Sequence, residues 1–290
     1  MNENIFEKSL EFSPESGTEK LERLNDILAE EAVKEAEEES NIPKDFLLSE
    51  LQSSEHTGAF SRLHFLGENF VVKERLSDIA FANLKESRSL LKPKVFEKIA
   101  RLEKQETAEQ KKETLEQVLA LRDKLDNNRL LCRHYFPDNV MDGHYVVKDN
   151  KSGLPAIFFI QEKLPEDCLF LHLDQLDVVV DDETRTRFVS FVAGLKNMFR
   201  DFGLIIDFQT LDNIAYSPSK QQFYAFDFDP LIPSPECEKE LHQRICMVEP
   251  FGNKEIKTFT GNSTRSESEI SCENLETLER IILAEAGQNR

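Results

Sequence analysis

The strongest constraint on the fold is an apolar stripe that runs through residues 182–202. Large apolar side chains recur there at every third or fourth position: Phe188, Phe191, Val192, Leu195, Met198, Phe199 and Phe202. This spacing places them on one face of a helix, and so apolar a face belongs in a protein core. Gly203 follows directly, and glycine commonly ends helices. We therefore expect a buried helix over 182–202.

Short strand patterns flank this helix on both sides. The expected strands cover residues 60–74 as a hairpin, 145–147, 157–160, 213–217 and 222–227. The hairpin turns at Gly67, and residues 80–125 have a helical pattern. A strand-rich first half followed by a helix and a second hairpin predicts the α+β class.

Charge and cysteine usage exclude several classes of protein. The chain has 36 Lys and Arg against 55 Asp and Glu, a formal charge of −19. We expect no nucleic-acid partner, because this field repels phosphate backbones, and no membrane span, because apolar runs of about 18 residues are lacking. Five scattered cysteines without a CxxC pair argue against a disulfide framework or a zinc module. We expect a cytoplasmic protein, or one secreted into a host cell by specialised machinery.

Composition divides the chain into three parts. Residues 1–54 are predicted to be an acidic tail with an amphipathic helix, which is either exposed or a site for a protein partner. Residues 55–250 hold most of the phenylalanines and form the folded domain. Residues 251–290 are rich in serine and acidic residues, and we expect this tail to be mostly disordered.

Polar residues stand at strand ends throughout the folded domain. Lys73 ends the apolar strand that starts at Phe70, and the strand at 156–160 runs into the polar segment Gln161–Leu164 before a proline. Further along the chain, Asp207 follows a short apolar strand. Asn213 then precedes the second hairpin, and Asp227 follows it.

In this order the pieces resemble the protein-kinase-like superfamily over about residues 57–235. The resemblance implies that Lys73 pairs with nucleotide phosphates and that Gly58 is the remnant of the glycine-rich loop. It implies that Gln161–Leu164 is the hinge, where Glu162 and Leu164 offer backbone groups to the adenine edge. The implied glutamate partner of Lys73 is Glu116, with Glu86 as the alternative.

The same resemblance also implies which residues carry out catalysis and bind the metal. Asp207 matches the catalytic base or orienting carboxylate, while Asn213 and Asp227 match the ligands of Mg²⁺. It implies a two-lobed fold, with a small antiparallel-sheet N-lobe at about 55–164 and an abbreviated helical C-lobe at about 165–250. The expected activity transfers the γ-phosphoryl group of ATP to a hydroxyl of a protein or small molecule.

Several departures from the family pattern stand beside this match. Asp207 and Asn213 are six positions apart, whereas the family spacing of five selects Phe208. We favour Asp207, with one extra residue in its loop. The triplet Asp-Phe-Gly reads Asp227-Phe228-Asp229, and no Ala-Pro-Glu follows. The abbreviated C-lobe resembles atypical bacterial kinases, including secreted effector kinases.

These departures keep other interpretations open. A pseudokinase would keep both lobes and serve as a binding module, and an accidental match would leave a purely structural interaction protein. Asp227 and Asp229 also fit an Asp-x-Asp metal pair of a glycosyltransferase, although the alternating βαβ units of that class are missing. Asn213 by itself can simply cap a turn.

Overall fold

A computed structural model gives the fold of this chain. It describes residues 15–38, 40–57, 61–75, 108–151, 153, 155–171, 181–206, 208, 213–226, 231–234, 237, 241, 244–245, 256–257, 264–265 and 267–284. The chain divides into two compact units. The sheet unit comprises Glu39–Asp126 and Asp142–Lys163, and the helical unit comprises Met1–Glu38, Asn127–Met141 and Leu164–Arg290. The described residues form four α-helices and several antiparallel sheets, which confirms the α+β class.

The sheet unit is built on a five-stranded antiparallel sheet with the order β1-β2-β3-β5-β4. Its strands are β1 (Leu51–Thr57), β2 (Ser61–Leu66), β3 (Phe70–Arg75), β4 (Gly143–Asp149) and β5 (Pro155–Glu162). The expected hairpin is β2–β3, and Gly67 in its turn has φ +61°, a conformation that glycine adopts without strain. The short 3₁₀-helix η1 (Leu48–Glu50) leads into β1.

The chain before β1 contributes to the core of the sheet unit. Ile42 and Phe46 are buried together with Val72, Phe158 and Ile160 on one face of the sheet. The rings of Phe46 and Phe158 meet edge to face, with centroids 5.4 Å apart. Residues 40–51 are therefore part of a folded core, where composition alone indicated a tail.

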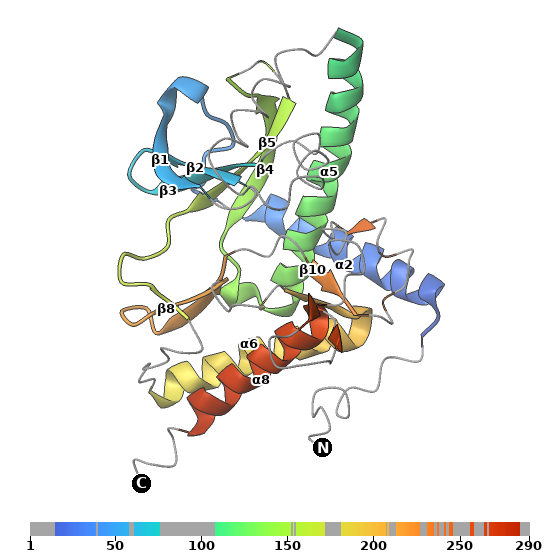
Figure 1. Cartoon of the computed structure of the whole chain (residues 1–290), viewed down its shortest axis with the longest axis vertical. Coiled ribbons are helices and arrows are strands. Elements are labelled where there is room, and N and C mark those ends of the chain that lie inside the picture. The colour runs from blue at the N-terminus through green and yellow to red at the C-terminus, as the bar shows by residue number, and fades with distance from the viewer. Residues whose placement is uncertain are drawn as a thin grey trace. The chain divides into compact units, whose positions relative to one another are not determined.

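The helical unit contains the remaining described elements (Figure 1). They are α2 (Gly17–Glu37), the C-terminal part of α5 (Ala108–Tyr135), η2 (Pro137–Asn139), β6 (Leu169–Phe170), α6 (Asp182–Phe202), β7 (Leu204–Ile206), β8 (Ile214–Ser217), β9 (Gln222–Ala225), β10 (Leu231–Pro233), β11 (Ile256–Lys257), β12 (Thr264–Arg265) and α8 (Glu267–Ala284). Helices α6 and α8 lie side by side, coloured yellow and red in Figure 1. None of the helices described is long and apolar enough to cross a membrane.

Helix α6 begins and ends where its sequence signals predict. At the N-terminus the Asp181 carboxylate accepts the Thr184 backbone N–H over 2.7 Å. At the C-terminus Gly203 takes the left-handed conformation, with φ 67°. The apolar stripe is buried, with Phe188 and Met198 fully enclosed. The predicted core helix is confirmed.

The C-terminal segment differs from the expected disorder, because residues 267–284 form helix α8. Its inward face combines small polar and apolar side chains, which are all buried: Ser268, Ser271, Cys272, Leu275, Leu278 and Ile282. A high serine content predicts an exposed segment. A serine hydroxyl can nevertheless be buried when it has a hydrogen-bond partner. This segment therefore belongs to the helical unit.

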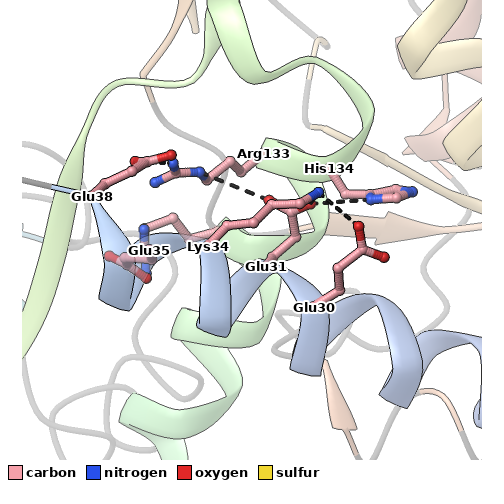
Figure 2. A network of polar contacts seen from close by, with 8 residues as sticks. Glu30, Glu31, Lys34, Glu35, Glu38, Arg133 and His134 are labelled. Carbon is pink, nitrogen blue, oxygen red and sulfur yellow. Dashed lines mark hydrogen bonds and ion pairs between the residues drawn. The ribbon is translucent and has the colours of Figure 1, made fainter.

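Helix α2 also packs within the helical unit, against α5 (Figure 2). The carboxylate of Glu31 is only 5% exposed and lies 2.8 Å from Lys34 Nζ and 3.3 Å from His134 Nδ1. Nearby, the 3% exposed Arg129 side chain pairs with Glu35 over 2.5 Å. Part of the acidic face that the charge pattern assigned to solvent or to a protein partner thus contacts its own chain.

Candidate functional site

Lys73 lies on the third strand of the sheet unit. In the antiparallel register it stands opposite Leu63 of β2 and Phe159 of β5. Because side chains alternate along a strand, Lys73 lies on the face opposite to the buried Val72. Its side chain is half-buried. The strand is as expected, but Lys73 does not end it, because β3 continues through Glu74 to Arg75.

The segment predicted to be the hinge, Gln161–Leu164, begins with the last two residues of β5 and continues two residues beyond the strand. Glu162 is the exposed last residue of β5 and pairs with Phe70, and Leu164 is half-buried. The backbone N–H of Lys163 donates to the carbonyl oxygen of Asn69 over 2.9 Å, which ties this segment to the β2–β3 turn. The amide of Lys163, between the two residues implied to face adenine, is thus used within the sheet unit.

Of the two glutamates predicted to pair with Lys73, the structure describes one. Glu116 lies on α5 and is exposed to solvent. Glu86 lies outside the described residues, as do Gly58, Asp207 and Asp227.

Asn213 is placed at the open end of the β8–β9 hairpin. Its carbonyl oxygen accepts the backbone N–H of Phe226 over 3.4 Å, directly after β9 ends. Phe226 is the chain neighbour of Asp227, so one backbone hydrogen bond links the position of Asn213 to the residue that precedes Asp227. The structure therefore brings the chain at 213 and the chain at 226 together.

A second backbone pairing lies on the chain just outside this hairpin. Ile206, the last residue of β7, pairs with Leu231, the first residue of β10. Asp207 follows Ile206 in the sequence, and Asp227 lies only four positions before Leu231. Two connections carry the predicted polar residues: one holds Asp207 and Asn213, and the other holds Asp227. Both connections run between strands whose end residues are paired, Ile206 with Leu231 and Ile214 with Ala225.

The closed end of the same hairpin is held by an aspartate that sequence reasoning missed. Asp167 Oδ1 accepts the Ser217 hydroxyl over 2.8 Å, and Oδ2 accepts the Ser219 backbone N–H over 2.6 Å. The hydrogen bonds from the Ser219 backbone and the Ser217 side chain lower the pKa of Asp167 below its usual value. Asp167 therefore stays ionised and helps to fix the turn of the hairpin.

Phe208, the residue that the family spacing would select, is a core residue. Its side chain is 0% exposed. Its backbone N–H donates to Ser271 Oγ over 3.1 Å, and its carbonyl oxygen accepts Asn274 Nδ2 over 2.9 Å. A buried phenylalanine offers no proton-accepting group, so Phe208 cannot serve as a catalytic base. Ser271 and Asn274 carried no sequence signal, because serine and asparagine are common in loops and tails.

The donor set that the resemblance assigns to a metal has the right chemistry for Mg²⁺. An amide oxygen of Asn213 and carboxylate oxygens of Asp227 are hard ligands, which Mg²⁺ prefers. Elsewhere in the described ranges, no three His, Cys, Asp or Glu side chains cluster as metal ligands.

Comparison of the chain with protein-family models and with curated proteins found no match.

Proposed function

We propose that this protein is an atypical kinase-like phosphotransferase that uses ATP and Mg²⁺. The observation that carries the proposal is the hydrogen bond between Asn213 and Phe226. It favours a common site for Asn213 and Asp227, the two residues that resemble the metal ligands of the superfamily. Mg²⁺ bound to their oxygens would neutralise phosphate charge, which matters for a chain with a net charge of −19.

The sheet unit supports the nucleotide-binding half of the proposal. Lys73 lies on β3, within an antiparallel sheet whose β5 ends inside the segment Gln161–Leu164. This is the order of strand-3 lysine, strand and hinge that the resemblance implies. The buried helix α6, followed by β7 and the β8–β9 hairpin, supports an abbreviated helical C-lobe. A two-lobed kinase-like fold is accordingly part of the proposal.

The proposed chemistry is a single displacement at phosphorus. The acceptor hydroxyl oxygen forms a bond to the γ-phosphorus of ATP while the bond from γ-phosphorus to the β–γ bridging oxygen breaks. The electron pair of that bond stays on the bridging oxygen, which leaves as part of ADP. The hydroxyl proton passes to the Asp207 carboxylate. The Lys73 ammonium holds the phosphates as a point charge.

One observation favours a second function, a pseudokinase that binds partners without transferring phosphate. That observation is the spacing from Asp207 to Asn213, which is six positions where the family pattern has five, and so departs from the pattern of a catalytic loop.

Nucleotide binding and phosphate transfer by the full-length protein test the proposal. We expect MgATP to raise the Tm, because a ligand present at 100 times its Kd stabilises the folded state by roughly 2.7 kcal/mol. Without Mg²⁺, or in D227A or K73M, the shift should shrink, while E68Q in the exposed β2–β3 turn should match the wild type.

Transfer of radiolabelled γ-phosphate to protein or small-molecule acceptors then separates the two functions. Metal-dependent binding that D227A abolishes, together with transfer that D207N abolishes, supports the phosphotransferase. The same binding without transfer to a broad acceptor panel supports the pseudokinase. Absence of metal-dependent nucleotide binding contradicts the proposed enzyme.

A further inference from the structure

The side chain of Gln161 combines burial with an unused hydrogen-bond acceptor. Gln161 is the last buried residue of β5 and is only 4% exposed, whereas the next residue, Glu162, is exposed. Its Nε2 group donates to the carbonyl oxygen of Glu162 over 3.4 Å, while Oε1 is buried and has no hydrogen-bond partner among the residues that the structure describes. Buried polar atoms nearly always have a partner, so an acceptor of this kind is a candidate contact for a ligand.

The carbonyl oxygen of Glu162 determines which end of the Gln161 amide carries the oxygen. A carbonyl oxygen only accepts hydrogen bonds, so the amide atom that faces it is the NH₂ nitrogen. Rotation of the amide by half a turn would set two oxygens against each other and leave the NH₂ group without its acceptor. Gln161 therefore presents an acceptor, and not a donor, on the side away from Glu162.

Gln161 lies on the same face of the sheet as Lys73. In the register of β3 and β5, Gln161 stands opposite Val71, and Phe159 stands opposite Lys73. Because side chains alternate along each strand, all four side chains lie on one face. Gln161 and Lys73 are therefore diagonal neighbours, a relation in which the Cβ atoms lie within roughly 8 Å of each other.

The side chains next to Gln161 on this face are apolar. Its neighbour on β4 is Gly143, which contributes no side chain. The Phe159 ring fills the space beside this glycine, since a Cβ at position 143 would lie 2.4 Å from Phe159 Cζ. Val71 and Phe159 thus supply apolar surface beside one acceptor and one cation. A flat ring that carries an amino group and is joined to an anionic group has the complementary chemistry.

We infer that Gln161 binds the 6-amino group of a purine nucleotide and makes the site selective for adenine, an inference that rests on the proposed nucleotide binding. The amino group of adenine donates a hydrogen bond to Oε1, whereas the 6-oxo group of hypoxanthine or guanine would place a second acceptor against it. Lys73 attracts the phosphates of the same nucleotide. The sequence resemblance implied backbone contacts to adenine from this segment, and Gln161 adds a side chain that a substitution can remove.

The burial of Oε1 strengthens this contact. An exposed acceptor exchanges a hydrogen bond with water for one with the ligand, and the two nearly cancel. In Gln161 the oxygen is already shielded from water in the folded protein, so little is lost when the amino group binds. One hydrogen bond at this position can therefore discriminate strongly between bases.

The test compares three triphosphates in matched full-length variants. MgATP carries a 6-amino group, MgITP carries a 6-oxo group, and the Mg²⁺ complex of purine riboside triphosphate carries only hydrogen at that position. Q161M removes the amide and keeps an unbranched side chain of similar length. D149N, at the exposed end of β4, is the control. The Tm measured as a function of nucleotide concentration gives an apparent Kd for each pair.

We expect the wild type to bind MgATP about tenfold or more tightly than the other two nucleotides, the discrimination that one buried hydrogen bond provides. Q161M should weaken the binding of MgATP by about tenfold and bring the three Kd values to within about threefold of one another. D149N should keep the wild-type Kd values.

The outcomes distinguish this inference from the function on which it rests. If the wild type binds all three nucleotides equally and transfers phosphate from them, Gln161 does not select adenine and the phosphotransferase stands. If Q161M weakens all three by the same factor, Gln161 only shapes the site and the inference is overturned. If the wild type binds no nucleotide, both proposals fall. Q161L takes the place of Q161M if that variant does not fold.

Discussion

The backbone N–H of Phe226 donates to the backbone carbonyl oxygen of Asn213 over 3.4 Å, so this contact does not depend on the identity of the Asn213 side chain. The hairpin closure and the amide oxygen proposed for Mg²⁺ can therefore be separated by one substitution. N213A removes the amide oxygen and leaves the backbone hydrogen bond available.

We predict that N213A weakens Mg²⁺-dependent ATP binding by tenfold or more, since even outer partners of metal ligands are worth about 10- to 100-fold. Its Tm without ligand should match that of the wild type. Titration of Mg²⁺ at fixed ATP, followed by thermal shift, measures the change. K220A, at the exposed closed end of the same hairpin, is the control. Equal Mg²⁺ dependence in N213A and wild type would remove Asn213 from the metal site.

Helix α8 should behave as part of the core. Leu278 is 0% exposed, whereas Leu283 of the same helix is 39% exposed. L278A should lower the free energy of unfolding by about 2–5 kcal/mol, because it leaves a cavity. L283A should change it by no more than about 0.5 kcal/mol. Urea unfolding of both variants measures this difference. Equal free energies of unfolding for L278A and L283A would show that residues 267–284 do not pack into the core.

The contact between α2 and α5 should depend on Glu31. Its buried carboxylate contacts Lys34 and His134. Glu31 Oε2 also lies 3.8 Å from Arg133 Nε. E31Q should lower stability by about 1–3 kcal/mol, since the buried Glu31 side chain loses its charged contacts with Lys34 and Arg133. E30Q removes an exposed carboxylate from the same Lys34 and should have little effect. Chemical denaturation at low and high salt provides the comparison, and similar midpoints for the two variants would argue against a structural role of Glu31.

The cap of helix α6 should make a pH-dependent contribution. The hydrogen bond from the backbone N–H of Thr184 lowers the pKa of Asp181 below its usual value of 3.8. A carboxyl group whose pKa is lower in the folded state stabilises that state above its unfolded pKa, and this stabilisation disappears as the pH falls through the folded pKa.

D181N keeps an oxygen that can cap the helix but removes the charge. We therefore expect wild type to be more stable than D181N at pH 7, with the difference shrinking below about pH 4. Urea midpoints measured from pH 7 to pH 2 show the trend. A difference that stays constant over this range would mean that the charge of Asp181 does not contribute.

The sequence predicted the elements whose ends carry explicit chemical signals. Helix α6 was predicted with its observed bounds, because its apolar stripe ends at Gly203. The β2–β3 turn was marked by Gly67 in the same way. The placement of Lys73 on β3 and of Asn213 directly before β8 followed from those elements, although β3 extends two residues beyond Lys73.

The helix expected in the acidic N-terminal segment is observed as α2, but contacts between distant parts of the chain carried no such signal and were missed. In α8 the buried face includes Ser268 and Ser271, whose burial depends on partners far away in the sequence. In α2 the buried Glu31 looked like any solvated glutamate, because its partners come from α5. The support of Phe208 by α8 is of the same kind: it arises from long-range pairing, which local patterns do not encode.

The division of the chain into units has a consequence for synthesis on the ribosome. Every segment of the sheet unit has been made once Lys163 is complete, whereas the helical unit combines Met1–Glu38 with residues up to the C-terminus. The α5 partners of helix α2, among them Arg129 and His134, are made before Lys163, whereas Asp201, which pairs with Arg23 of α2, is made after it. Because domains generally fold as units during synthesis, we expect the sheet unit to form first and the helical unit to be completed last.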